Sequence, residues 1–150
     1  MENKPNIELM LKNMMMIWAA LFSSQVMFIL VAFAVKPELM GLDPAKPLSG
    51  ENPAVVGIFA ILAITLIVAS FVIRTSFRNR AVTEQSPALL QTGMLVSCAM
   101  CEFASIFGLL LAISYDYQYF IAFIVLGMAG MVFHFPTRAS LMASSFGKKL

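Results

Sequence analysis

Four long apolar segments constrain this chain more than any other feature. They run over about residues 14–35, 54–73, 88–114 and 119–135. A helix needs about 20 apolar residues to cross the hydrocarbon core of a bilayer. The runs are continuous and do not alternate with polar residues, which favours helices over the strands of a barrel. We therefore expect an all-α integral membrane protein with four transmembrane helices in a single membrane domain, residues 1–150.

The composition excludes several classes of function. The chain is 60% hydrophobic and 12% charged, whereas a soluble domain is about 45–50% apolar and about 25% charged. Its basic residues are scattered over the ends of the segments, so we expect no nucleic-acid partner. The sequence has no phosphate-binding glycine loop and no Ser/His/Asp set. We expect no cofactor, no metal and no enzyme, and at most a non-catalytic membrane subunit of an ion-translocating complex.

The polar stretches between the segments predict where the helices begin and end. The first segment follows a polar head, Met1–Asn13, and is too long for a signal-peptide core, so we expect an uncleaved span. A polar, basic loop is expected at residues 74–87. Ser86 and Pro87 suit the N-cap and the first position of the third helix. A Ser-rich tail is expected after Pro136.

The distribution of Lys and Arg predicts the orientation. Eight basic residues lie in the head, the loop 74–87 and the tail, against two, Lys36 and Lys46, between the first and second segments. Basic residues accumulate on the cytoplasmic side of membrane proteins. We therefore expect both termini in the cytoplasm, in a bacterial inner (cytoplasmic) membrane.

Glu102 is the one acid inside the four apolar segments. A carboxylate at the centre of a bilayer costs about 2.5–3.5 kcal/mol on insertion scales, and such residues mark ion or proton pathways. Apolar surroundings favour the neutral acid, because loss of solvation disfavours the charge. One interpretation is an ion-binding carboxyl at mid-membrane. The other is a structural pin, a neutral acid bonded to a neighbouring helix, of the kind worth about 0.6–2 kcal/mol.

Four polar residues lie at the expected depth of Glu102 and could form hydrogen bonds with it. Gln25 is the first choice, because its amide can donate to a carboxylate or pair with an acid. Thr65 is the second. Ser24 precedes Gln25, and Ser105 follows the acid by three residues, which places it near the same helix face.

The residues around Glu102 form a recognisable pattern. Gly93–Met94 precedes the acid, Ile106–Leu109 (Ile-Phe-Gly-Leu) follows it, and the polar stretch Arg80–Leu90 comes before the helix. Over roughly residues 74–113 this pattern resembles the carboxylate-bearing hairpin of the proteolipid, subunit c of the rotary ATPases. The second segment lacks the Gly-x-Gly-x-Gly repeat through which that family packs its ring.

The resemblance implies an oligomeric or ring-forming subunit whose Glu102 binds an ion during translocation. A stator or another membrane subunit would supply a separating Arg. Sodium-type relatives carry Ser or Thr just after the acid and Tyr five residues on, whereas this chain has Phe103, Ala104 and Phe107. We therefore expect a proton. A non-rotary homo-oligomer in the lipid bilayer fits equally well. The alternative function is a structural or assembly scaffold.

Three smaller patterns have simpler interpretations. Cys98 and Cys101 are expected to be packing residues, because a zinc site would need further ligands. His134 is either an ordinary interfacial residue or a proton exit, since an imidazole changes charge near neutral pH. Gly127 and Gly130 form a small-residue face, which suits self-association or packing within one subunit.

Overall fold

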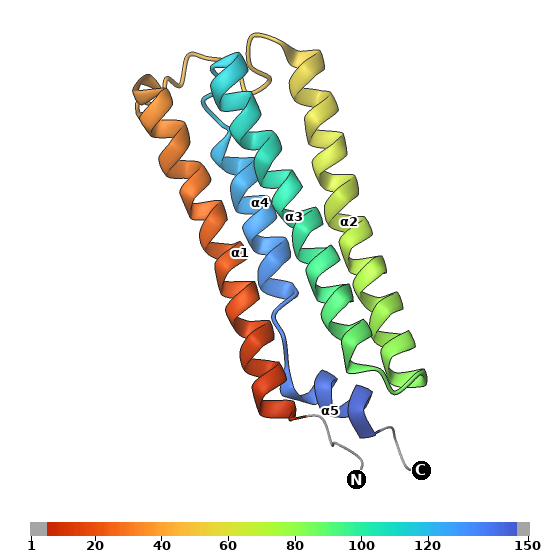
Figure 1. Ribbon diagram of the computed structural model, residues 1–150. Helices are drawn as coiled ribbons and strands as arrows, with labels where there is room; N and C mark the ends of the chain where they lie inside the picture. Colours follow the sequence, from red (N-terminus) through yellow and green to blue (C-terminus); the bar gives the residue numbers. More distant parts are fainter. Residues whose placement is uncertain (1–5, 147–150) are drawn as a thin grey trace.

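The computed structural model describes residues 6–146, and these residues form helices without any strand (Figure 1). In chain order the elements are α1 (Ile7–Val35), the short 3₁₀ helix η1 (Pro37–Met40), α2 (Pro53–Thr83), α3 (Pro87–Tyr115), α4 (Ile121–Phe133) and α5 (Arg138–Phe146). Helices α1 to α4 run side by side, and α3 packs against each of the other three. Helix α5 lies across the end of the bundle that holds the start of α1 and the α2–α3 turn. The expected all-α class is confirmed.

Within residues 6–146, three helices are long and apolar enough to cross a membrane: α1, α2 and α3. Helix α4 has 13 residues, or about 20 Å at 1.5 Å per residue, which is short of the hydrocarbon core of about 30 Å. It is followed after a break by α5, at an angle of 49°, and the pair counts as a fourth span only if taken together. Pro136 lies in the break and disfavours helical backbone before it. The residues expected as a tail form α5.

The outer face of α2 is apolar and exposed. Its exposed residues include Ile58, Ile61, Leu62, Ile64, Val68 and Val72. Soluble monomers rarely expose apolar patches of this extent. Together with the three long apolar helices, this surface is that of an integral membrane protein.

Helix α2 continues past Arg74 to Thr83, so the loop expected at residues 74–87 is wrong. The apolar run ends at Arg74, but residues 75–86 contain neither Gly nor Pro. A helical backbone satisfies its own hydrogen bonds whatever the polarity of its side chains. The chain turns only at Gln85, which has a left-handed φ of 53°.

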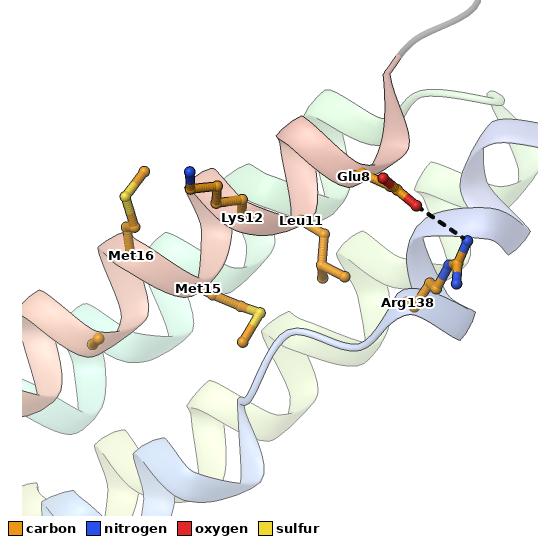
Figure 2. A pocket seen from close by; sticks show the side chains of 7 residues that line it. Glu8, Leu11, Lys12, Met15, Met16 and Arg138 are labelled. Atoms are coloured by element: carbon orange, nitrogen blue, oxygen red, sulfur yellow. Dashed lines mark ion pairs between the residues drawn. The ribbon is translucent and has the colours of Figure 1, made fainter.

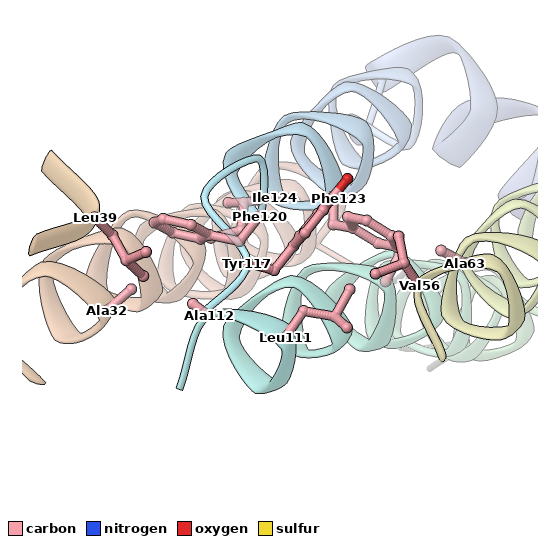
Figure 3. Packing of buried hydrophobic residues seen from close by; sticks show 11 residues of the cluster. Ala32, Leu39, Val56, Ala63, Leu111, Ala112, Tyr117, Phe120, Phe123 and Ile124 are labelled. Carbon is pink, nitrogen blue, oxygen red and sulfur yellow. The ribbon is translucent and has the colours of Figure 1, made fainter. Parts of the chain in front are cut away.

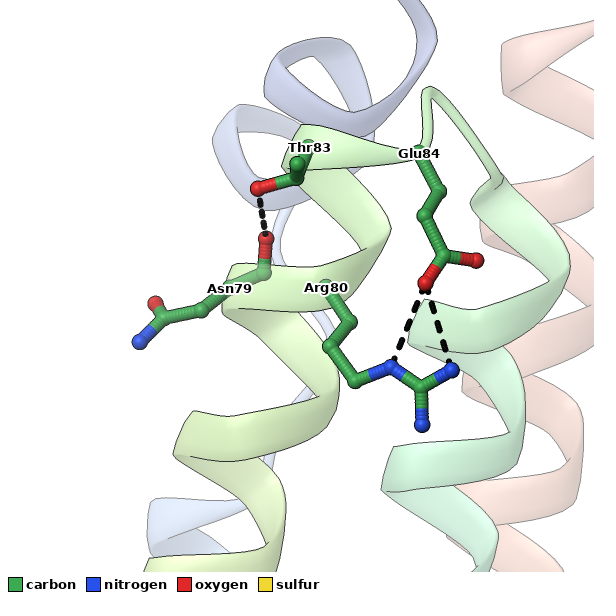
Figure 4. A network of polar contacts seen from close by, with 4 residues as sticks. All are labelled: Asn79, Arg80, Thr83 and Glu84. Carbon is green, nitrogen blue, oxygen red and sulfur yellow. Dashed lines mark hydrogen bonds and ion pairs between the residues drawn. The ribbon is translucent and has the colours of Figure 1, made fainter.

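The polar end of α2 makes an ion pair and a hydrogen bond within the helix (Figure 4). Arg80 Nη2 lies 3.2 Å from Glu84 Oε1, four residues on. The Thr83 hydroxyl donates to the main-chain oxygen of Asn79 at 3.1 Å. Exposed pairs of this spacing stabilise a helix by about 0.3–0.5 kcal/mol. They help the helix to extend beyond its apolar part.

The beginnings of α1 and α3 follow known capping patterns. Helix α1 begins within the expected polar head, at Ile7, because Asn6 Oδ1 accepts from Leu9 N at 3.2 Å and caps it. Helix α3 begins at Pro87 with Ser86 as its N-cap, as expected, although the Ser86 side chain makes no capping bond.

Two apolar clusters fill the bundle, one toward each end. Figure 3 shows the cluster near the 36–52 connection, whose members include Ala32, Val56, Ala63, Leu111, Phe120, Phe123 and Ile124. The other cluster includes Met14, Ala81, Leu90, Met94, Met131 and Leu141. Buried polar side chains occur along the whole bundle: Gln25, Ser70, Ser97, Ser105, Gln118, His134 and Ser144.

Glycines allow α4 to approach α3 closely. A Cβ on Gly127 would overlap the Ser105 hydroxyl, and one on Gly130 would lie 2.9 Å from Cys101 Sγ. The small-residue face therefore packs within one subunit, which decides between the two uses that the sequence left open.

Candidate functional site

Glu102 lies in the middle of α3, 15 residues after Pro87 and 13 before Tyr115. Each end of the helix is thus about 20 Å away. The side chain is half-buried and contacts α1. Within residues 6–146 it makes no ion pair.

The partner of Glu102 is Ser24 on α1. The Ser24 hydroxyl is hydrogen-bonded to Glu102 Oε1 and also lies 2.7 Å from the main-chain oxygen of Leu21. A hydroxyl has one proton to donate, and a carbonyl oxygen can only accept. When Ser24 donates to Leu21, the proton in the Ser24–Glu102 bond must come from the carboxyl. The arrangement therefore accommodates a neutral Glu102 with every proton in place.

Gln25 and Ser105, two of the other expected partners, bond to each other instead. Ser105 Oγ donates to Gln25 Oε1 at 3.0 Å, and Gln25 Nε2 donates to Met131 Sδ at 3.8 Å. Both Gln25 and Ser105 are fully buried in the bundle. The expectation that Gln25 is the first partner of Glu102 is wrong, because successive residues of a helix point about 100° apart. Ser24 meets the acid, and Gln25 turns toward the interior.

Thr65 does not reach Glu102 either. It is exposed on α2, and its hydroxyl donates to the main-chain oxygen of Ile61 at 2.7 Å. The sequence placed Thr65 by depth, but depth does not determine which face of a helix a side chain occupies.

A second polar cluster joins α2, α3 and the end of α4, and sequence reasoning missed it. Ser70 is at its centre: His134 Nε2 lies 2.9 Å from Ser70 Oγ, and the Ser97 hydroxyl donates to the main-chain oxygen of Ser70 at 3.0 Å. His134 is fully buried, and its place at the membrane interface stays a prediction. The one available signal was a polar residue near the middle or end of each of three apolar segments.

Cys98 and Cys101 are free thiols buried in the apolar cluster near α5. Residues 6–146 hold no group of three or more His, Cys, Asp or Glu side chains that could bind a metal ion. Both cysteines pack against the apolar residues of this cluster, as expected for packing residues.

An open groove of about 560 Å³ lies where α1 meets α5 (Figure 2). Its lining residues are Glu8, Leu11, Lys12, Met15, Met16, Ala19 and Arg138. Arg138 Nη2 lies 3.7 Å from Glu8 Oε1 across it, and both side chains are exposed. The groove includes neither Glu102 nor Ser24, so it is separate from the candidate site.

No family model, no curated protein and no solved structure matches this chain.

Proposed function

We propose that this chain is a proteolipid-like subunit of an oligomer in a bacterial inner membrane, in which Glu102 reversibly binds a proton during ion translocation. In this proposal α4 and α5 together make a fourth span, and both termini lie in the cytoplasm. The eight-to-two division of basic residues supports that orientation.

The observation that carries the proposal is the contact between Ser24 and Glu102. Among residues 6–146 the carboxyl has one hydrogen-bond partner, a hydroxyl whose own proton can go to Leu21. A carboxylate in apolar surroundings is stable only with several donors or a cation. The site is therefore suited to the neutral acid at rest, and it offers little to hold the charged form.

The half-buried position of Glu102 gives the proposal its mechanism. The neutral carboxyl can face lipid at low cost. It releases its proton when water or a cation comes near, because either one stabilises the carboxylate. An Arg on a separate stator subunit would supply such a cation. A second copy of the chain would cover the α1–α3 face between these events.

Carbodiimide labelling of the protein in bilayers tests the proposal, because carbodiimides react with protonated carboxyls in apolar surroundings. We expect Glu102 to be labelled, the labelling to fall as pH rises, and sodium to give no protection. Glu102→Gln is the control. Absence of labelling at every pH would overturn the proposal, and protection by sodium would overturn the choice of ion.

The same contact favours a second candidate, a structural or assembly scaffold. The Ser24–Glu102 bond connects α1 to α3, and Gln can make an equivalent bond. In a scaffold, Glu102→Gln should leave oligomer size and stability unchanged, as native mass spectrometry would show, and no proton-dependent activity should be lost.

A further inference from the structure

The groove between α1 and α5 is built mainly from one face of α1. Its lining residues on that helix, at spacings of one, three and four, are Glu8, Leu11, Lys12, Met15, Met16 and Ala19, and Arg138 of α5 lies across from them. Residues at such spacings share one face of a helix. In Figure 2, Leu11 and Met15 point from α1 toward the chain that leads into α5. The groove of about 560 Å³ has the size of a small-molecule site, about 300–1,000 Å³.

This face of α1 changes from charged to apolar along its length. Glu8 and Lys12 lie before the first apolar segment, which begins at residue 14, whereas Met16 and Ala19 lie within it. Lys12 and Ala19 are about 10 Å apart along the helix axis. The groove thus runs from the polar end of α1 into the span, where a bilayer changes from headgroups to acyl chains. A ligand that fills it needs a polar end and an apolar chain.

The charges at the polar end of the groove favour an anion. Lys12 and Arg138 supply two cations against the one carboxylate of Glu8. Arg138 Nη2 lies 3.7 Å from Glu8 Oε1, beyond the about 2.7–3.2 Å of an N–H···O hydrogen bond. Among residues 6–146, Lys12 makes no ion pair. The Arg138 guanidinium can therefore still bind phosphate oxygens, for which its forked geometry is suited.

We propose that the groove binds one anionic phospholipid per chain, with the phosphate at Arg138 and Lys12 and an acyl chain along Met15. Methionine side chains are flexible and adapt to apolar ligands of varied shape. Basic pockets beside transmembrane helices bind anionic headgroups in this way. A second copy of the chain is the less suitable occupant, because a symmetric contact would place the same cations opposite each other. The lipid site does not rest on the proposed function.

The single tryptophan of the chain reports on the groove. Trp18 precedes Ala19 and follows Met15 by about one turn. The protein is placed in phosphatidylcholine bilayers with a small share of lipid whose brominated chains quench tryptophan fluorescence. We expect brominated phosphatidylglycerol to quench Trp18 at about a fivefold lower mole fraction than brominated phosphatidylcholine, the factor that one net positive charge gives. Inorganic phosphate should not reverse the quenching, because it has no acyl chain.

Two pairs of charge variants test the headgroup contacts. Arg80 and Glu84 form an exposed ion pair at the same end of the bundle but outside the groove. They therefore provide matched controls for Arg138 and Glu8. Arg138→Gln should abolish the preference for phosphatidylglycerol, and Arg80→Gln should keep it. Glu8→Gln should increase the preference by about fivefold, because it removes a negative charge beside the phosphate, and Glu84→Gln should not.

Two alanine variants test the place of the acyl chain. Ala19→Phe fills the apolar part of the groove, whereas Ala20→Phe adds the same ring at the next exposed position, which does not line it. We expect Ala19→Phe to weaken quenching by brominated phosphatidylglycerol and Ala20→Phe to leave it unchanged.

Three results would overturn the lipid site: equal quenching by the two lipids, a preference that survives Arg138→Gln, or equal losses in Arg138→Gln and Arg80→Gln. Native mass spectrometry adds a fourth. A smaller oligomer in Ala19→Phe than in Ala20→Phe would assign the groove to a contact between copies. None of these measurements involves Glu102, so the carbodiimide test of the proposed function can fail or succeed independently.

Discussion

Ser105 of α3 donates a 3.0 Å hydrogen bond to Gln25 of α1, and both side chains are completely buried. The amide nitrogen of Gln25 in turn donates a hydrogen bond to the sulfur of Met131 on α4. This chain of polar contacts ties together α1, α3 and α4. Because neither group can reach water, the loss of one leaves the other without a partner.

We predict that Ser105→Ala lowers the free energy of unfolding by about 1–2 kcal/mol, because Gln25 Oε1 loses its donor. Unfolding in mixed detergent micelles measures the change. Thr65→Val is the matched control, since Thr65 is exposed and bonds only within its own helix. Equal losses in the two variants would contradict the prediction.

Because α3 and α4 approach closely at Gly130, a larger side chain there should lower the stability of the fold. A Cβ there would meet Cys101 Sγ and the Ile67 side chain, each at 2.9 Å. We expect Gly130→Ala to destabilise the fold by about 1–3 kcal/mol through overpacking. Gly57→Ala is the control, because a Cβ on Gly57 meets nothing within 4 Å. It should stabilise α2 by about 0.5–1 kcal/mol. Thermal unfolding of the two variants should move in opposite directions.

The Ser24–Glu102 bond predicts an infrared signature. In Ser24→Ala the neutral carboxyl loses its hydrogen bond to Ser24, so its carbonyl stretch should move to higher frequency. Ser23→Ala provides the comparison, because the exposed Ser23 donates to the main-chain oxygen of Ala19. A band that does not move in Ser24→Ala would show that the contact is not made in the bilayer.

The ion pair at the other end of the bundle predicts a loss of stability at alkaline pH. Lys36 Nζ lies 2.6 Å from Asp116 Oδ1, joining the end of α1 to the end of α3. The hydrogen bond to Asp116 raises the pKa of Lys36 above its ordinary 10.5. The folded state therefore holds this proton more tightly than the unfolded chain does. The stabilisation is complete below pH 10.5 and is lost as pH rises through the raised pKa.

Thermal unfolding on the two sides of that pKa measures this loss, and Asp116→Asn should reduce it. Asn tolerates the left-handed φ of 49° at this position, so the turn is preserved. Burial also raises the pKa of Tyr117, which titrates in both proteins, so the difference between them isolates Lys36. An identical alkaline loss in the two proteins would contradict the assignment.

The helical class, three long apolar helices and the start of α3 at Pro87 follow from local sequence. Hydrophobicity and capping residues act over a few turns, so they can be recognised without the fold. The end of α2 could not be predicted this way. The end of an apolar run indicates where the chain leaves the bilayer, whereas a helix ends where its backbone turns. Gln85, which takes a left-handed conformation, carries no strong signal for such a turn.

The candidate site likewise has features that the sequence shows and features that only the packing of the helices decides. The presence of an acid at the middle of a helix is a property of the chain, and so is the set of polar residues near its depth. Which of them meets Glu102 depends on the rotation of α1 about its axis, which is set by packing against α3 and α4. That rotation brings Ser24 to the acid and turns Gln25 to Ser105. The burial of His134 against Ser70 is likewise a tertiary result: it needs the break before α5 and the glycines that bring α4 against α3.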